Sequence, residues 1–149
     1  MDEIIIKDVI LTPLNKISHP KGDIFHGMKS SDVGFTGFGE AYFSTIKNGE
    51  IKGWNKHKSM TMNLIVPVGS VKFVLYDDRK SIRKNINFLE VELSPDNYHR
   101  LSIPPGLWLA FKGNGSGTNL ILNIASTEHD TDEIERTELE KISYNWNSV

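Results

Sequence analysis

The chain contains no cysteine among its 149 residues. This absence excludes thiol catalysis, cysteine-ligated zinc and a disulfide framework, and it fits a cytoplasmic protein. No apolar run approaches the roughly 18 residues of a membrane helix, and the start, Met1-Asp2-Glu3, lacks the features of a signal peptide. The formal net charge is only −2, which argues against general nucleic-acid binding. The sequence therefore predicts a soluble cytoplasmic protein that binds neither membranes nor nucleic acids.

The periodic segments that the chain does have show the two-residue repeat of β-strands. They cover residues 71–76, 88–93, 99–103 and 119–124. Turn-forming residues separate them, at 48–49, 68–70, 77–78, 94–97, 104–106 and 113–117. Many short strands at this spacing predict one all-β domain over residues 1–149, an antiparallel sandwich or barrel, with the jelly roll among the candidates. We interpret the glycine-rich segment 113–117 as a hairpin loop, because it joins two strands and lacks the lysine of a phosphate loop.

The two ends of the chain differ from its middle. Residues 4–6 and 9–11 are apolar and predict an N-terminal strand. In a small barrel such a strand often pairs with a partner subunit, because an exposed apolar edge promotes association, and we therefore expect a homodimer. Residues 130–136 predict one helical turn, with Asp130 or Thr131 as its N-cap and acidic side chains in its first turn.

A cationic stretch, residues 51–58, contains three lysines, a tryptophan and His57 directly before the apolar run 64–69. Positive neighbours disfavour the protonated imidazole, so His57 is a candidate neutral base. The alternative is a solvated basic strand end, and the residues alone leave both interpretations open. The five histidines form neither His-x-His nor His-Glu-x-x-His, so we predict no metal site and no cofactor.

Other segments carry side chains that suit a binding site. Strand alternation puts Glu40 and Tyr42 on one face, where they form either an acid–base pair or part of an outer polar surface. Arg79 ends a strand, where it either makes a local ion pair or holds a phosphate. Trp108 follows a stiff turn and either enters the core or stacks on a base or sugar.

In their order along the chain, these segments resemble the cupin-fold family of dTDP-4-dehydrorhamnose 3,5-epimerases and the related dTDP-sugar 3,4-ketoisomerases. The resemblance covers residues 21–136. It rests on Lys21-Gly22, Lys52-Gly53, Val68-Gly69-Ser70-Val71, Asp78-Arg79, Ile103-Pro104-Pro105-Gly106-Leu107-Trp108 and Glu133-Ile134-Glu135-Arg136. It implies a cupin-type jelly-roll β-barrel with a short C-terminal helical turn. It also implies metal-independent epimerisation or ketoisomerisation of a nucleotide-linked 4-keto deoxysugar, in polysaccharide or antigen sugar biosynthesis.

The chain departs from this family at three positions. Asn55 stands where the epimerases carry their catalytic histidine, Leu109 replaces a second pocket histidine, and Asn63 replaces a lysine. His57-Lys58, in contrast, matches the second histidine and the lysine of the ketoisomerases. A metal-dependent cupin is disfavoured, because His57 stands alone and Leu109 cannot ligate a metal.

The resemblance also implies roles for the candidate residues. His57 removes the proton next to the ketone, and Tyr42, Lys52 or Lys56 stabilises the enolate oxygen. The substrate-binding candidates are Lys21 and Arg79 for the diphosphate, Trp54 or Trp108 for the base or sugar, and Glu40, Asn55 and Asn63. The competing interpretation is a non-catalytic nucleotide-sugar or carbohydrate-binding cupin that has lost the acid–base residues.

Overall fold

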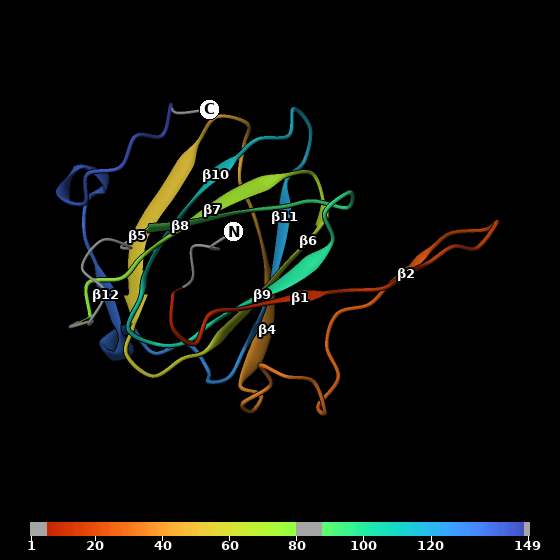
Figure 1. The fold of residues 1–149 in the computed structure, drawn as a ribbon, viewed down its shortest axis with the longest axis horizontal. Coiled ribbons are helices and arrows are strands. Elements are labelled where there is room, and N and C mark those ends of the chain that lie inside the picture. Colours follow the sequence, from red (N-terminus) through yellow and green to blue (C-terminus); the bar gives the residue numbers. More distant parts are fainter. Residues whose placement is uncertain (1–5, 80–87, 148–149) are drawn as a thin grey trace, which may run out of the picture.

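Two five-stranded antiparallel sheets face each other in the computed structural model, which describes residues 6–79 and 88–147 (Figure 1). The first sheet has the order β1-β9-β6-β11-β4, with bounds Ile10–Pro13, His99–Ile103, Met62–Val68, Leu120–Ala125 and Glu40–Thr45. The second has the order β12-β5-β10-β7-β8, with bounds Ile134–Arg136, Ile51–His57, Trp108–Gly113, Val71–Tyr76 and Phe88–Leu93. This arrangement confirms the predicted cupin-type jelly roll.

The core lies between the two sheets and consists of the alternate residues that face inward. On β7 these are Val71, Phe73 and Leu75, all completely buried, and β9 contributes Leu101 and Ile103 from the opposite sheet. Fully burying an aliphatic or aromatic side chain of this size stabilises a fold by about 1.5–3 kcal/mol. The period of two in the sequence therefore encodes which face of each strand packs against the other sheet.

A second apolar cluster covers the outer face of the second sheet. It contains Trp54, Val74, Trp108 and Ala110, against which the C-terminal segment packs. The Trp54 indole is completely buried and donates a hydrogen bond to the Leu139 carbonyl oxygen at 3.2 Å. The chain after β12 therefore acts as a cover over this sheet, and it includes the short 3-10 helix η2 (Leu139–Lys141).

The segment 113–117 is not the hairpin loop that the sequence suggested. It joins β10 to β11, which belong to different sheets. Glycine-rich composition predicts a turn but does not reveal whether the flanking strands pair or separate. The buried Asn119 side chain holds this connection by accepting hydrogen bonds from the Ser70 and Gly115 backbone N–H groups at 2.9 and 3.1 Å.

The sequence predictions for the two ends of the chain are confirmed in part. The N-terminal strand exists as β1, but it pairs with β9 of the same chain, and residues 4–5 lie outside the described residues. Near the C-terminus, the expected helical turn is the 3-10 helix η1 (Thr131–Glu133). Its N-cap is Asp130, whose side chain accepts a hydrogen bond from the Asp132 N–H at 2.9 Å.

A two-stranded arm projects from the barrel, made of β2 (Lys16–Ile17) and β3 (Ile24–Phe25) (Figure 1). Ile17 and Ile24 are 46% and 56% exposed, although they are large and apolar. Lys21 lies in the turn that joins the two strands, so its position depends on where the arm points. A hairpin of this size is only marginally stable in water by itself.

Candidate functional site

Strand β5 turns three polar side chains toward the barrel interior by means of a β-bulge. Its partner β10 aligns Phe111 with Lys52 and Leu109 with Asn55, and the register shifts between these two pairs. Phe111 and Leu109 are two residues apart and share the inward face, whereas Lys52 and Asn55 are three apart. Without the extra residue, Lys52 and Asn55 would face opposite sides of the sheet. The bulge thus brings Lys52, Asn55 and, two residues further on, His57 to one face.

Gly53 makes this bulge possible, because its φ is +148° and a Cβ at this position would lie 2.4 Å from the Ala110 Cβ. We expect Gly53→Ala to lower the free energy of unfolding by about 2–4 kcal/mol, from backbone strain and overpacking. Gly117→Ala is the matched control, since nothing lies within 4 Å of a Cβ there. Urea denaturation of both variants tests this, and equal stability of the two would contradict the expectation.

His57 is buried, with 7% of its surface exposed, and its ring pairs with Glu133 of η1. The Nδ1 atom of His57 lies within hydrogen-bond distance of Glu133 Oε1. The second carboxylate oxygen, Oε2, accepts the backbone N–H groups of Lys58, Ser59 and Met60 at 3.1, 3.0 and 3.2 Å. Glu133 therefore joins the C-terminal turn to the end of β5 and fixes the imidazole.

The surroundings of Glu133 lower its pKa from 4.5 to about 2. Burial acts in the opposite direction, but the hydrogen bonds from His57, Ser59 and Met60 outweigh it. An ionised carboxylate next to Nδ1 keeps a proton on that nitrogen, which leaves Nε2 of a neutral ring as the acceptor. The charge beside His57 is therefore negative, in contrast to the cationic surroundings that its sequence neighbours suggested.

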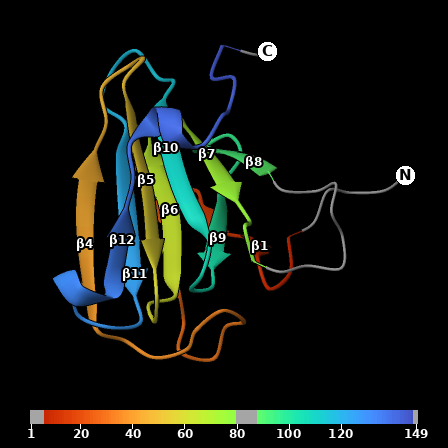
Figure 2. The same ribbon diagram turned by 90° about the vertical axis from the view of Figure 1, so that its left-hand side faces the viewer.

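Tyr42 faces inward from the opposite sheet. It pairs across the strands with Asn123, which shares its face of β11 with the core residues Ile121 and Ala125. The Asn123 side-chain amide donates to the Tyr42 hydroxyl at 3.0 Å. Tyr42 remains 39% exposed because β4 is an edge strand, and Figure 2 shows β4 at the outer edge of its sheet. Solvent therefore reaches the inward face of the barrel on this side.

Glu40 and Lys52 have partners of their own at this side of the barrel. Glu40 lies at the start of β4 and accepts a hydrogen bond from the His129 backbone N–H. Lys52 donates from Nζ to the Thr45 carbonyl oxygen at 2.7 Å. An exposed ammonium group held by a single carbonyl needs little free energy to turn toward an anionic ligand.

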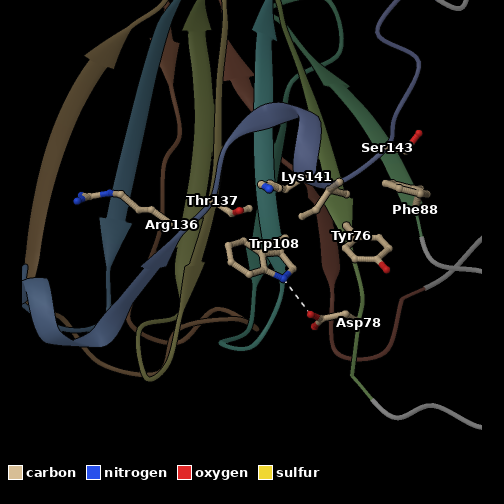
Figure 3. Close-up of a pocket in the computed structure, with 9 residues that line it drawn as sticks. Tyr76, Asp78, Phe88, Trp108, Arg136, Thr137, Lys141 and Ser143 are labelled. Atoms are coloured by element: carbon tan, nitrogen blue, oxygen red, sulfur yellow. Dashed lines mark hydrogen bonds between the residues drawn. The ribbon is translucent and has the colours of Figure 1, made fainter.

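Other candidates from the sequence lie on the outer face of the second sheet. Lys56 points away from His57, forms a salt bridge to Asp78 at 3.4 Å and lies 4.9 Å from the Trp108 ring centroid. The Trp108 indole donates to Asp78 at 3.0 Å, as Figure 3 shows. Trp54 also faces outward, beneath the C-terminal segment. The structure thus separates Lys56, Trp54 and Trp108 from the inward-facing group.

Asn63 and Arg79 are engaged in structural contacts. Asn63 is buried, donates to the Gly34 carbonyl oxygen at 3.1 Å and bonds Ser102 across the sheet. Arg79 forms a salt bridge with Asp77 at 3.0 Å. The Arg79 side chain also lies close to Gly106, whose N–H donates to the His57 carbonyl oxygen at 2.8 Å. Arg79 is therefore at the same end of the barrel as His57.

Sequence reasoning missed the role of Glu133, which lies 76 residues from its histidine partner. The acidic segment 133–136 contributed to the resemblance, but nothing local marks one of its carboxylates as a partner of His57. In the described ranges, no group of three or more histidine or acidic side chains is arranged to hold a metal ion. None of the helices in those ranges has the length and apolar character needed to span a bilayer.

Comparison with solved structures shows that this antiparallel jelly roll is also the fold of dTDP-sugar isomerases and dTDP-4-dehydrorhamnose 3,5-epimerases. The chain belongs to the family described as "FdtA: WxcM-like, C-terminal", whose model matches residues 7–143. This membership confirms the resemblance found in the sequence. Among curated protein sequences, none matches the chain.

Three solved structures illustrate the relationship. A dTDP sugar isomerase from Desulfovibrio desulfuricans G20 is 32% identical, with a TM-score of 0.90 over 97% of this chain and 94% of that one. A histidine-to-asparagine variant of the 3,4-ketoisomerase QdtA from Thermoanaerobacterium thermosaccharolyticum, in complex with TDP-4-keto-6-deoxyglucose, is 23% identical (TM-score 0.73, covering 89% and 90%). A dTDP-4-dehydrorhamnose 3,5-epimerase from Sulfolobus tokodaii is 21% identical (TM-score 0.79, covering 95% and 84%).

Proposed function

We propose that this protein isomerises a nucleotide-linked 4-keto-6-deoxysugar, with His57 as the base that moves the proton. The observation that carries the proposal is the buried His57–Glu133 pair on the inward face of a dTDP-sugar isomerase fold. The ligand in the solved 3,4-ketoisomerase, TDP-4-keto-6-deoxyglucose, supports this substrate class. The choice between ketoisomerisation and epimerisation depends on where the proton returns.

The chemistry follows from the acidity of a carbon next to a ketone. Nε2 of His57 removes the proton at C3, and the electrons move onto the C4 oxygen to form an enolate. Glu133 stabilises the imidazolium that forms, because its carboxylate already accepts the Nδ1 proton. Return of a proton to C4, with loss of the C3 hydroxyl proton, moves the ketone to C3. Return to the opposite face of C3 inverts that centre instead.

The inward-facing polar groups supply the rest of the proposed site. Lys52 and the Tyr42 hydroxyl are proposed to stabilise the enolate oxygen, and Asn55 is proposed to bind a sugar hydroxyl; their inward-facing strand positions support these roles. Arg79, near Gly106 at the His57 end of the barrel, is proposed to bind the diphosphate. We leave Lys56, Trp54, Trp108 and Asn63 out of the catalytic site, since they face the outer side or are held by structural contacts.

One observation favours a second candidate function, a cupin that binds nucleotide sugars without catalysis. Leu109 is buried on the inward face directly opposite Asn55, so both positions where the family carries pocket histidines lack an ionisable group. A site with a single base performs fewer proton transfers. The two functions differ in proton exchange, not in binding.

The decisive experiment incubates the purified protein with TDP-4-keto-6-deoxyglucose in D₂O and follows the sugar by ¹H NMR. We expect loss of the C3 proton signal through exchange and the appearance of a new keto sugar, with the same rate after treatment with EDTA. Calorimetric titration with TDP gives the binding in parallel. Saturable binding without exchange would assign the non-catalytic function, and a rate abolished by EDTA would contradict the metal-independent mechanism.

The proposal includes a homodimer in which the β2–β3 arm packs on a second copy of the chain. The exposed apolar side chains of Ile17 and Ile24 support it, and burial against a partner would stabilise an otherwise marginal hairpin. Lys21 at the tip would then reach the partner and contribute a positive charge there. The cytoplasmic location remains a prediction of the sequence.

Replacing both isoleucines tests this arrangement. We expect the Ile17→Asp, Ile24→Asp double variant to elute as a monomer in size-exclusion chromatography with light scattering, because two carboxylates would be buried unpaired at the interface. Lys47→Asp, an exposed position outside the arm, should remain dimeric. A monomeric wild-type protein at micromolar concentration would disprove the dimer.

A further inference from the structure

A pocket of about 640 Å³ lies on the outer face of the second sheet, separate from the inward-facing group around His57. Tyr76, Phe88 and Trp108 form its aromatic side, and the segment after β12 adds Thr137, Lys141, Ile142 and Ser143 to the lining. Figure 3 shows this segment passing above the Trp108 ring. The volume is typical of small-molecule sites. Nothing in the proposed reaction uses this pocket.

The strands place the two sites back to back. On β5, His57 faces the barrel interior while its neighbour Lys56 faces the outer side, over the Trp108 ring. On β10, Leu109 faces the interior and Trp108 lines the outer pocket. The sheet itself therefore separates the two sites, and a ligand in one does not touch the other.

The charged side chains in the lining of the outer pocket are Lys141, Asp78 and Arg136. Lys141 lines it, and no hydrogen bond or salt bridge engages its ammonium group within the described part of the chain. Lys56 lies at the edge, paired with Asp78. Each Asp78 oxygen accepts one bond, from Lys56 or from the Trp108 indole, and keeps a lone pair for a donor on a ligand. Arg136 points away from the pocket in Figure 3.

We propose that this outer pocket binds a nucleoside phosphate. Its aromatic side chains provide apolar surface for a flat base, and the Asp78 carboxylate can accept a hydrogen bond from an imide N–H or a sugar hydroxyl. The ammonium group of Lys141, whose charge also acts on the neighbouring Glu140 carboxylate, provides the positive charge for the phosphate. A purely apolar molecule would leave the Lys141 ammonium group without a partner. This binding goes beyond the proposed isomerase reaction and does not depend on it.

The Trp108 indole N–H is the reporter for the test, because it lies in the pocket and bonds to Asp78. The full-length protein is titrated with thymidine 5′-monophosphate, and the ¹⁵N–¹H indole signals are followed by NMR. We expect a saturable shift of the Trp108 signal. Thymidine, which has no phosphate, and ribose 5-phosphate, which has no base, should each bind at least about tenfold more weakly, since each loses one of the two groups of contacts.

Lys141→Ala should weaken binding of the monophosphate about five- to tenfold, and Lys141→Glu should weaken it further by reversing the charge. Lys47→Ala is the matched control, an exposed lysine remote from the pocket lining, and should bind as the wild type does. Lys52→Ala separates this site from the isomerase site, and its Trp108 shift should be unchanged. The proposal is overturned if the monophosphate leaves the Trp108 signal in place, or if Lys141→Ala binds like Lys47→Ala.

Discussion

His57→Asn is expected to reduce hydrogen exchange at C3 of TDP-4-keto-6-deoxyglucose by about 10²–10⁴-fold, the usual contribution of a positioned general base. Asparagine still donates a hydrogen bond to Glu133 and keeps the side chain polar, but its amide cannot accept a proton from carbon. The carboxylate therefore keeps a partner while the base is lost. The measurement is the loss of the C3 proton signal in D₂O.

The control for this variant is His129→Asn, which replaces an exposed imidazole a few residues before Glu133 in the chain. It should exchange at the wild-type rate. Circular dichroism and binding of TDP should be similar in both variants, so that a lost fold is not mistaken for a lost base. Exchange at the wild-type rate in His57→Asn would show that another group removes the proton.

Glu133→Gln is expected to have the second-largest effect, a fall of about 10²–10⁴-fold in the isomerisation rate with the fold retained. The glutamine oxygen is expected to turn toward the N–H groups of Ser59 and Met60, where Glu133 already accepts. Its NH₂ group then donates to Nδ1 of His57, which moves the ring proton to Nε2. The nitrogen that should act as the base is then blocked.

A change of tautomer distinguishes this positioning role from a purely structural one. The ¹⁵N signals of the His57 ring should show protonated Nδ1 in the wild type and protonated Nε2 in Glu133→Gln. Glu135→Gln, an exposed neighbour on β12, is the matched control and should change neither the tautomer nor the rate. Wild-type activity in Glu133→Gln would remove Glu133 from the mechanism.

A comparison of the wild type with Glu133→Gln also tests how the stability of the fold depends on pH. Because the folded pKa of Glu133 is about 2 against an ordinary value of 4.5, its ionised form stabilises the fold above pH 4.5, and this contribution disappears as the pH falls from 4.5 toward 2. The full contribution is at most about 3.5 kcal/mol, from the shift between 4.5 and about 2 at roughly 1.4 kcal/mol for each pKa unit. The difference in melting temperature between wild type and Glu133→Gln should therefore shrink over this range. A constant difference would contradict the ionised carboxylate.

The local pattern of apolar and polar residues was sufficient to predict the architecture of the fold. Alternating apolar residues on β7 and β9 identify both the strands and their buried faces, because side chains of a strand alternate strictly between two sides. Which strands pair with one another could not be predicted from the sequence to the same extent. The connection 113–117 crosses between sheets instead of closing a hairpin, since turn residues define a change of direction and not a partner.

The candidate site was likewise predictable from the sequence only in part. Alternation correctly grouped Glu40 with Tyr42, and the structure places Tyr42 inward opposite Asn123. Counting residues along β5 could not show which side of the sheet each lysine near His57 faces, because the bulge at Gly53 changes which residues of β5 share a face. That is why Lys52 joins Asn55 and His57 on the inner side, while Lys56 faces outward.

The amino-acid sequence by itself determined the class of fold, the family and the histidine on which the proposed chemistry depends, because these follow from periodicity and from motifs within a few residues. Only the tertiary structure decided which charge lies beside that histidine. Glu133 reaches His57 across 76 residues, held by backbone N–H groups that exist only once β5 and η1 are packed together. Contacts between distant segments depend on how the sheets fold over one another, and no local pattern of residues records that.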